Sequence, residues 1–255
     1  MSEQKRYAIV TPYYKEDRHL LERCIHSVQE QTLAADHILV ADGYPQGWLD
    51  GEPVRHIRLD RNHADYGDTP RAIGAMLAVA EGYAGIAFLD ADNWFEPAHV
   101  ALCVEASLRN PSCDYVIAKR NLCRPDGSVI PVEDAPISLF VDTSCFFLLP
   151  GSYHMIHRFG LVPFQLAPIC DRVFFASLRQ EKLVAEMVME KTVNYHCLWP
   201  AVYRNAGEVP PPDATKRVDY EPMRRWLESL NPREREIVRR RCGLTVDPML
   251  GKRQS

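Results

Sequence analysis

Two carboxylates one residue apart, Asp90 and Asp92, are the side chains of this sequence with the clearest capacity for chemistry. They follow the apolar run at residues 86–89, which predicts a buried strand. Open α/β sheets bind ligands at the carboxyl ends of their strands. Carboxylates there suit Mg²⁺ or Mn²⁺, which prefer oxygen ligands and are shared with substrate phosphates. A second interpretation is that both aspartates only cap the helix that Pro97 opens.

Strands and helices alternate around this pair. Apolar runs and helical periodicity predict strands at residues 7–11, 37–41, 55–59, 115–118, 140–149 and 188–198, and helices at residues 17–31, 69–80, 97–108 and 171–183. The strand at 140–149 is expected to be central, and turn chemistry at 124–127 predicts a hairpin with residues 128–132.

One helix start lies close upstream of the aspartate pair. In the segment from Gly67 to Arg71 we expect Thr69 to cap the helix and Pro70 to take its first position. Apolar periodicity predicts one helix face formed by Ile73, Met76, Leu77 and Ala80.

Composition narrows the class of protein. The 255 residues are 46% hydrophobic and 25% charged, which is ordinary for a soluble globular protein. No apolar run approaches the roughly 20 residues that span a bilayer. The polar residues 1–6 lead straight into a strand, so we expect no signal peptide and a cytoplasmic location. The eight cysteines have no C-x-x-C spacing, which favours buried reduced thiols over a zinc site or disulfides.

Charge is distributed unevenly along the chain. Its formal net charge is −4, yet residues 216–255 carry 11 Lys and Arg against 6 Asp and Glu. The main body is therefore acidic, which argues against nucleic acid as a partner. The basic tail is a candidate for peripheral contact with an anionic membrane or a partner protein, although a solvated helix face is the commoner meaning of such a run.

Four segments in order resemble the family 2 glycosyltransferases of the GT-A fold: IVTPYYKED, ERCIHSVQEQT, LVADG and FLDADNWFEP. The match covers residues 6–98, is looser to about residue 207 and is absent from the tail. The resemblance implies an α/β chain with a Rossmann-like, nucleotide-binding mixed sheet flanked by helices and a C-terminal helical tail. We expect a GT-A domain at 1–207, with a nucleotide-sugar half at 1–98 and an acceptor half at 99–207, and a Pro-rich connector and basic tail at 208–255.

The resemblance also implies an activity. It is the inverting transfer of a sugar from a nucleotide diphosphate sugar, with a UDP-sugar favoured, to an acceptor hydroxyl with Mn²⁺ or Mg²⁺ as cofactor. A cation would neutralise the leaving diphosphate while a carboxylate base deprotonates the hydroxyl. On the family pattern Asp92 would bind the metal directly, and Asp90 would bind it through water or hold the donor ribose.

Donor contacts follow from the same resemblance. They are expected at Thr11, Pro12 and Tyr13, which would flank the base, and at Asp42, Asp68 and Arg71. A simple turn at Asp42 and a surface ion pair at Arg71 are the alternatives that the sequence leaves open.

The candidate base is Asp171, because the family commonly carries an acid at the start of a late helix. An N-cap role would explain Asp171 equally well, and Asp142 and Asp134 compete for the role of base. His196 is a candidate third metal ligand, with a satisfied, packed histidine as the alternative.

Some features depart from the family pattern. The strand predicted at residues 37–41 ends in a single acid, Asp42, where the family usually has two. The segment 67–71 replaces a more usual Ala-Arg-Asn. A nucleotidylyltransferase is disfavoured because residues 12–16 contain no glycine. A catalytically silent sugar- or protein-binding module is a further alternative, which retention of Asp90, Asp92 and Asp171 makes less favourable.

Overall fold

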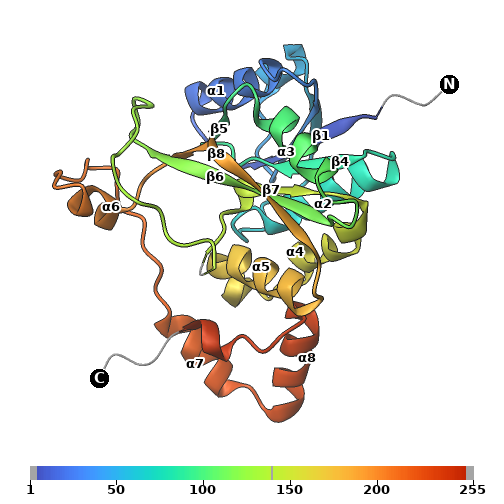
Figure 1. Cartoon of the computed structure of the whole chain (residues 1–255). Helices are drawn as coiled ribbons and strands as arrows, with labels where there is room; N and C mark the ends of the chain where they lie inside the picture. Colours follow the sequence, from blue (N-terminus) through green and yellow to red (C-terminus); the bar gives the residue numbers. More distant parts are fainter. Residues whose placement is uncertain (1–4, 139, 251–255) are drawn as a thin grey trace.

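A mixed eight-stranded sheet forms the centre of the protein (Figure 1). The structure is a computed structural model that describes residues 5–138 and 140–250. Across the sheet the strands are β3 (Arg55–Arg58), β2 (Asp36–Ala41), β1 (Tyr7–Tyr13), β4 (Gly85–Phe88), β7 (Phe146–Leu148), β6 (Tyr115–Cys123), β8 (Ala185–His196) and β5 (Trp94–Phe95). The first four are mutually parallel, so their carboxyl ends meet at one edge.

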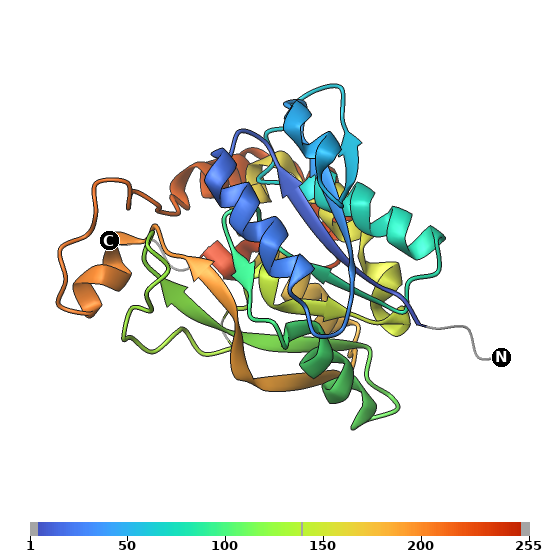
Figure 2. The same ribbon diagram turned by 90° about the horizontal axis from the view of Figure 1, so that it is seen from above.

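Helices cover both faces of this sheet. They are α1 (Arg18–Gln29), α2 (Asp68–Ala80), α3 (His99–Leu108), α4 (His157–Leu161), α5 (Cys170–Gln180), α6 (Pro200–Asn205), α7 (Glu221–Ser229) and α8 (Pro232–Cys242). Figure 1 shows α1 above the sheet and α4 and α5 below it, and Figure 2 looks down on α1 from above.

Alternation along β2 decides which helix covers which face. Leu39 packs with Leu21 of α1, whereas Val40 lies against α2 at Gly74. Successive side chains of a strand point to opposite faces. The helices α1 and α2 therefore lie on opposite sides of the parallel strands.

The helix α2 corrects two expectations. Its N-cap is Gly67 in a left-handed conformation, and Thr69 lies inside the helix, where its backbone N–H donates to Asp65 at 3.0 Å. The expected apolar face points outward, since Ile73 is 39% and Met76 47% exposed. Small residues meet the sheet instead, because a Cβ added at Gly74 would lie 2.6 Å from the side chain of Val10. Close backbone packing outweighed hydrophobic periodicity here.

The second half of the sheet differs in detail from the prediction. The expected long strand at 140–149 is a three-residue strand, β7, preceded by a 3-10 turn at Thr143–Cys145, although it is central as expected. The predicted hairpin after β6 is reduced to an isolated bridge between Cys123 and Val129.

The tail packs on the body of the protein. Its helices α7 and α8 lie below α4 and α5 in Figure 1 and share with α5 a buried cluster that includes Val173, Met223 and Leu227. Asn231 and Glu234 form the capping box that starts α8. Arg239 pairs with Glu236 of the same helix, so part of the basic charge is compensated locally.

Helices long and apolar enough to cross a membrane are absent from residues 5–138 and 140–250.

Candidate active site

The Asp-x-Asp segment is a rigid turn at the end of β4. The backbone N–H of Asn93 donates to the carbonyl of Asp90 at 2.9 Å. The fully buried Asn93 side chain donates to Ser144 Oγ at 3.0 Å and accepts from the backbone of His196 at 2.9 Å. The helix α3 starts at His99 with Ala98 as its N-cap, so the helix-cap interpretation of Asp90 and Asp92 is wrong.

The two aspartates of this turn have different surroundings. Asp90 accepts from Arg71 Nη2 at 2.7 Å and from Thr143 Oγ1 at 3.2 Å. The Asp92 carboxylate is partly exposed and accepts no hydrogen bond from the described residues. Asp90 is therefore held by the protein, whereas Asp92 is available to a ligand.

Three neighbouring carboxylates make the surroundings of Asp92 electrostatically negative. Burial, and then the neighbouring carboxylates of Asp90, Asp142 and Glu16, raise the pKa of Asp92 to about 7 against the opposing effect of Lys216. Like charges held close together disfavour ionisation of each member. A bound cation would relieve this repulsion.

His196, at the end of β8, contributes nitrogen atoms to the same region. The residue is buried, and both ring nitrogens lack a hydrogen-bond partner within the described part of the chain, so the alternative of a satisfied histidine is wrong. Burial lowers the pKa of His196, which favours the neutral imidazole that binds metals. Buried unpaired nitrogens are costly and point to a missing partner.

Asp92 and His196 offer one oxygen and one nitrogen donor in the same region, because the backbone of His196 bonds the side chain of Asn93, and donors of both types suit a divalent metal. Across residues 5–138 and 140–250, no group of three His, Cys, Asp or Glu side chains is placed to hold a metal ion.

Arg71 is fixed between two aspartates. It is 2% exposed, its Nη1 lies 3.3 Å from Asp68 Oδ1, and its Nη2 holds Asp90. Burial raises the pKa of Asp68 to about 8, although Arg71 opposes this effect. The alternative of an exposed surface ion pair is therefore wrong for Arg71, and the donor contacts expected of Arg71 and Asp68 stay predictions.

The remaining predicted donor residues lie at the carboxyl ends of β1 and β2. The Asp42 backbone donates to the Tyr13 carbonyl at 2.7 Å, which brings the two strand ends together. The Asp42 carboxylate accepts from the His63 ring at 2.6 Å and so anchors the loop after β3.

The hydroxyls of Thr11 and Tyr13 already form hydrogen bonds with histidines of the protein. Thr11 bonds His37 Nε2 at 2.9 Å, and Tyr13 bonds His56 Nε2 at 2.6 Å. Pro12 is also buried. Nucleotide contacts of Thr11, Pro12 and Tyr13 therefore stay predictions, and the structure leaves the side chains of Thr11 and Tyr13 with other partners.

Asp171 lies in the first turn of α5, where Ile169 is the N-cap, so the capping alternative is wrong. Its Oδ1 accepts from the backbone of Arg172 at 2.7 Å. Burial, and then the charge of Asp142, raises the pKa of Asp171 to about 7. A carboxyl that titrates near neutral pH is suited to general base catalysis.

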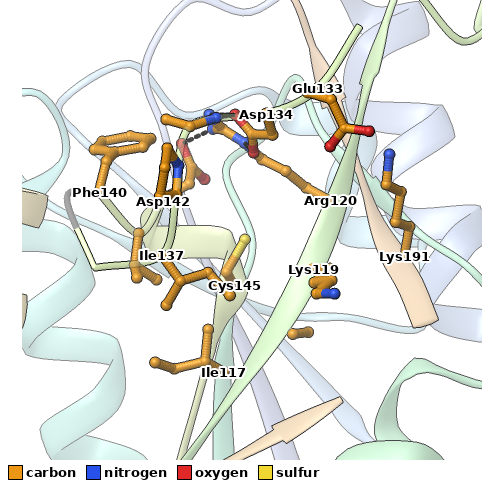
Figure 3. Close-up of a pocket in the computed structure, with 14 residues that line it drawn as sticks. Ile117, Lys119, Arg120, Glu133, Asp134, Ile137, Phe140, Asp142, Cys145 and Lys191 are labelled. Carbon is orange, nitrogen blue, oxygen red and sulfur yellow. Dashed lines mark hydrogen bonds and ion pairs between the residues drawn. The ribbon is translucent and has the colours of Figure 1, made fainter. Parts of the chain in front are cut away.

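The two competing carboxylates, Asp134 and Asp142, both pair with Arg120 (Figure 3). Arg120 donates to Asp142 at 3.0 Å and to Asp134 at 2.7 and 3.0 Å. Within the described residues Asp171 forms no such pair with an arginine, so it is the least engaged of the three carboxylates.

A pocket of about 260 Å³ lies beside these carboxylates (Figure 3). Arg120 and Asp142 line it, together with Phe140 and, at the other end, Glu133 and Lys191. The guanidinium of Arg120 lies over the rings of Phe140 and Tyr195, at 4.9 and 4.5 Å from their centroids. The pocket therefore combines aromatic, acidic and basic groups.

Several residues of the site had no signal in the sequence. Ser144 receives the bond from Asn93 and also accepts from the backbone N–H of Asp90 at 3.1 Å. Glu16 and Lys216 act on Asp92 through their charge. Glu16 lies in the segment IVTPYYKED but no role was expected of it there, and Ser144 and Lys216 belong to none of the four family segments, so tertiary contacts place these three residues here. Trp199 lies beside Lys216, which is 5.9 Å from its ring centroid.

Comparisons with known proteins agree with this architecture. A family model described as glycosyl transferase family 2 matches residues 8–165. The structure of S. aureus TarS 1–349 in complex with UDP aligns with a TM-score of 0.58 at 10% identity, over 92% of this chain and 70% of that one. The UDP-GlcNAc complex of the same fragment gives 0.55 at 11% identity, over 92% and 71%. At these identities the TarS likeness shows the fold alone. A search of curated proteins finds no match.

Proposed function

Because this chain belongs to glycosyltransferase family 2 and has the GT-A fold, we propose that it transfers a sugar from a nucleotide diphosphate sugar to a hydroxyl of an acceptor. The observation that carries the proposal is the rigid Asp90–Asn93 turn, which presents an unpaired Asp92 carboxylate. The same site holds Asp171, whose pKa burial raises to about 7.

The donor is a UDP-sugar in this proposal. The TarS structures named above hold UDP and UDP-GlcNAc, and this chain shares their fold, with β1 and β2 paired in parallel. The nucleotide would lie across the carboxyl ends of β1 and β2, near Asp42 and Tyr13. The diphosphate would then reach the end of β4.

Asp92 and His196 would hold Mn²⁺ or Mg²⁺. The bound cation would neutralise charge that develops on the leaving diphosphate. Asp90 would support the site from behind, because Arg71 and Thr143 already hold its carboxylate. The unpaired ring nitrogens of His196 support this assignment.

Asp171 would act as the base. Its Oδ1 is bonded to Arg172, so Oδ2 is the oxygen free to take the proton of the acceptor hydroxyl. The hydroxyl oxygen then forms its bond to the anomeric carbon as the bond to the diphosphate breaks on the opposite face. This displacement inverts the configuration of the anomeric carbon.

The acceptor would enter through the pocket of Figure 3. The pocket contains Asp142, whose charge is the main electrostatic influence on Asp171. Phe140 offers an apolar face, and Glu133 and Lys191 offer polar contacts at the mouth.

Calorimetry of UDP binding with and without Mn²⁺ tests this function. Asp92→Ala should abolish the gain in UDP affinity that Mn²⁺ gives the wild type, because the variant lacks the oxygen ligand. Asp60→Ala, which removes an exposed aspartate after β3, is the matched control and should keep the gain. An Asp92→Ala protein with the full Mn²⁺-dependent gain would reject the metal assignment. A wild-type protein that binds UDP with Mn²⁺ but never hydrolyses or transfers the sugar of UDP-sugars would indicate the silent module.

A further inference from the structure

The connector between α6 and α7 brings one lysine back to the site. Ala214 is buried in a cluster with Tyr195 and Tyr203, which anchors the connector. The backbone of Lys216 donates to the carbonyl of Leu198 at 2.8 Å. Both contacts hold this stretch of the connector against the segment that follows β8.

The side chain of Lys216 extends toward the Asp-x-Asp turn. Its Nζ donates to the Tyr195 hydroxyl at 2.9 Å and lies 5.2 Å from the centroid of the Tyr195 ring. Burial lowers the pKa of Lys216, but Tyr195, Asp92 and Asp142 outweigh this effect and raise it, so the amine is protonated. Tyr195 precedes His196, whose backbone bonds Asn93 of the Asp-x-Asp turn, and Arg120, which pairs with Asp142, lies over the Tyr195 ring. These contacts place the amine beside the site.

Three arginines close to the Asp-x-Asp turn and the pocket are already engaged. Arg71 is paired with Asp68 and Asp90, and Arg120 with Asp134 and Asp142. Arg23 gives its Nη2 to the carbonyl of Asp92, at 3.1 Å, and lies over the ring of Trp94. Each of these guanidinium groups has a structural partner inside the protein.

Lys216 differs from them in two respects. Its amine forms no ion pair within 4.0 Å to a carboxylate of the described residues, and the residue remains exposed to solvent. An ammonium is a point charge that suits phosphate oxygens. A ligand that enters beside Asp92 would therefore meet a protonated amine that needs no rearrangement of an existing ion pair.

We propose that Lys216 binds the diphosphate of the donor, and so adds a protein cation to the group that stabilises the leaving nucleoside diphosphate. This inference rests on the proposed function. It assigns the connector a role in donor binding, because residues 208–215 set the position of the amine. Tyr195 is a positioning residue in this arrangement, since its hydroxyl holds the amine before the donor arrives.

Affinities for UDP and for uridine, measured by calorimetry at one Mn²⁺ concentration, test the assignment. Lys216→Gln should weaken UDP binding roughly tenfold or more, the loss expected for one charged hydrogen bond. Uridine affinity should not change, because uridine has no phosphate. Lys216→Arg should recover most of the UDP affinity. The control Arg217→Gln removes the same charge from the neighbouring exposed residue and should leave UDP affinity unchanged.

Three outcomes would overturn the assignment. Wild-type UDP affinity in Lys216→Gln would show that the amine does not touch the diphosphate. Equal losses for UDP and uridine would show that the substitution displaces the connector instead. A wild-type protein that does not bind UDP under any of these conditions would reject the proposed function, and the role of Lys216 with it.

Discussion

Asp171→Asn should stabilise the protein at alkaline pH while it abolishes sugar transfer. In the wild type the carboxyl is partly buried beside Asp142, and this environment raises the pKa of Asp171 from 3.8 to about 7. The unfolded chain keeps the ordinary value. Ionised Asp171 therefore costs folding free energy, and a neutral amide of the same shape does not.

The sign follows from proton binding in the two states. Between pH 4 and 7 the folded protein holds a proton on Asp171 that the unfolded chain has released, so this carboxyl lowers the free energy of unfolding as pH rises through that range. A tenfold change in proton affinity corresponds to about 1.4 kcal/mol, which gives a ceiling of about 4 kcal/mol above pH 7. Because Asp171 keeps some access to water, we expect a gain of about 1–2 kcal/mol for the variant.

Urea denaturation at pH 5 and pH 8 measures this gain. The free energy of unfolding of Asp171→Asn should exceed that of the wild type clearly at pH 8 and by much less at pH 5. The amide oxygen of the variant can still accept the bond from the Arg172 backbone. The exposed substitution Asp60→Asn is the control and should show no such increase with pH. A gain that is equal at both pH values, or a loss at pH 8, would refute the argument from burial.

Activity of the same variant tests the role of the base independently. Removal of a general base typically costs about 10²- to 10⁴-fold in turnover. UDP affinity should stay within about twofold of the wild type, since no donor contact is assigned to Asp171. Full turnover in Asp171→Asn would exclude it as the base, whatever its effect on stability.

Two further predictions concern packing and buried polar groups. Gly74→Ala should destabilise the protein by about 1–3 kcal/mol, although alanine favours helices. The new Cβ would lie 2.6 Å from Val10 and 2.9 Å from Val40. A raised melting temperature would contradict the close packing of α2. Gln31→Ala should lower the free energy of unfolding, measured by urea denaturation, by about 2–3 kcal/mol. The Gln31 amide accepts from the backbone of Val100 at 3.0 Å and donates to the carbonyl of Glu96 at 2.9 Å. Unchanged stability would show that water replaces these bonds.

The first half of the fold could be read from the sequence because its signals are local. Apolar runs that end in polar residues mark β1, β2 and β4, and the structure pairs all three in parallel. The start of α8 was equally readable, since Asn231 and Glu234 form a capping box within four residues. Side-chain burial on α2 was not readable, because the fit of Gly74 against β1 and β2 is a property of three separate elements.

The sequence by itself determined the order of the elements and the identity of Asp90, Asp92, Asp171 and His196 as candidates. The family resemblance already gave the two aspartates different roles, and the tertiary structure supplies a physical difference between them, since Arg71 and Thr143 reach Asp90 from other elements and leave the Asp92 carboxylate unpaired. It also brought Lys216 back across the sheet edge to Tyr195. The physical reason is that capping and periodicity act over a few residues, whereas the desolvation and charge that set a carboxyl's pKa depend on groups far away in the chain.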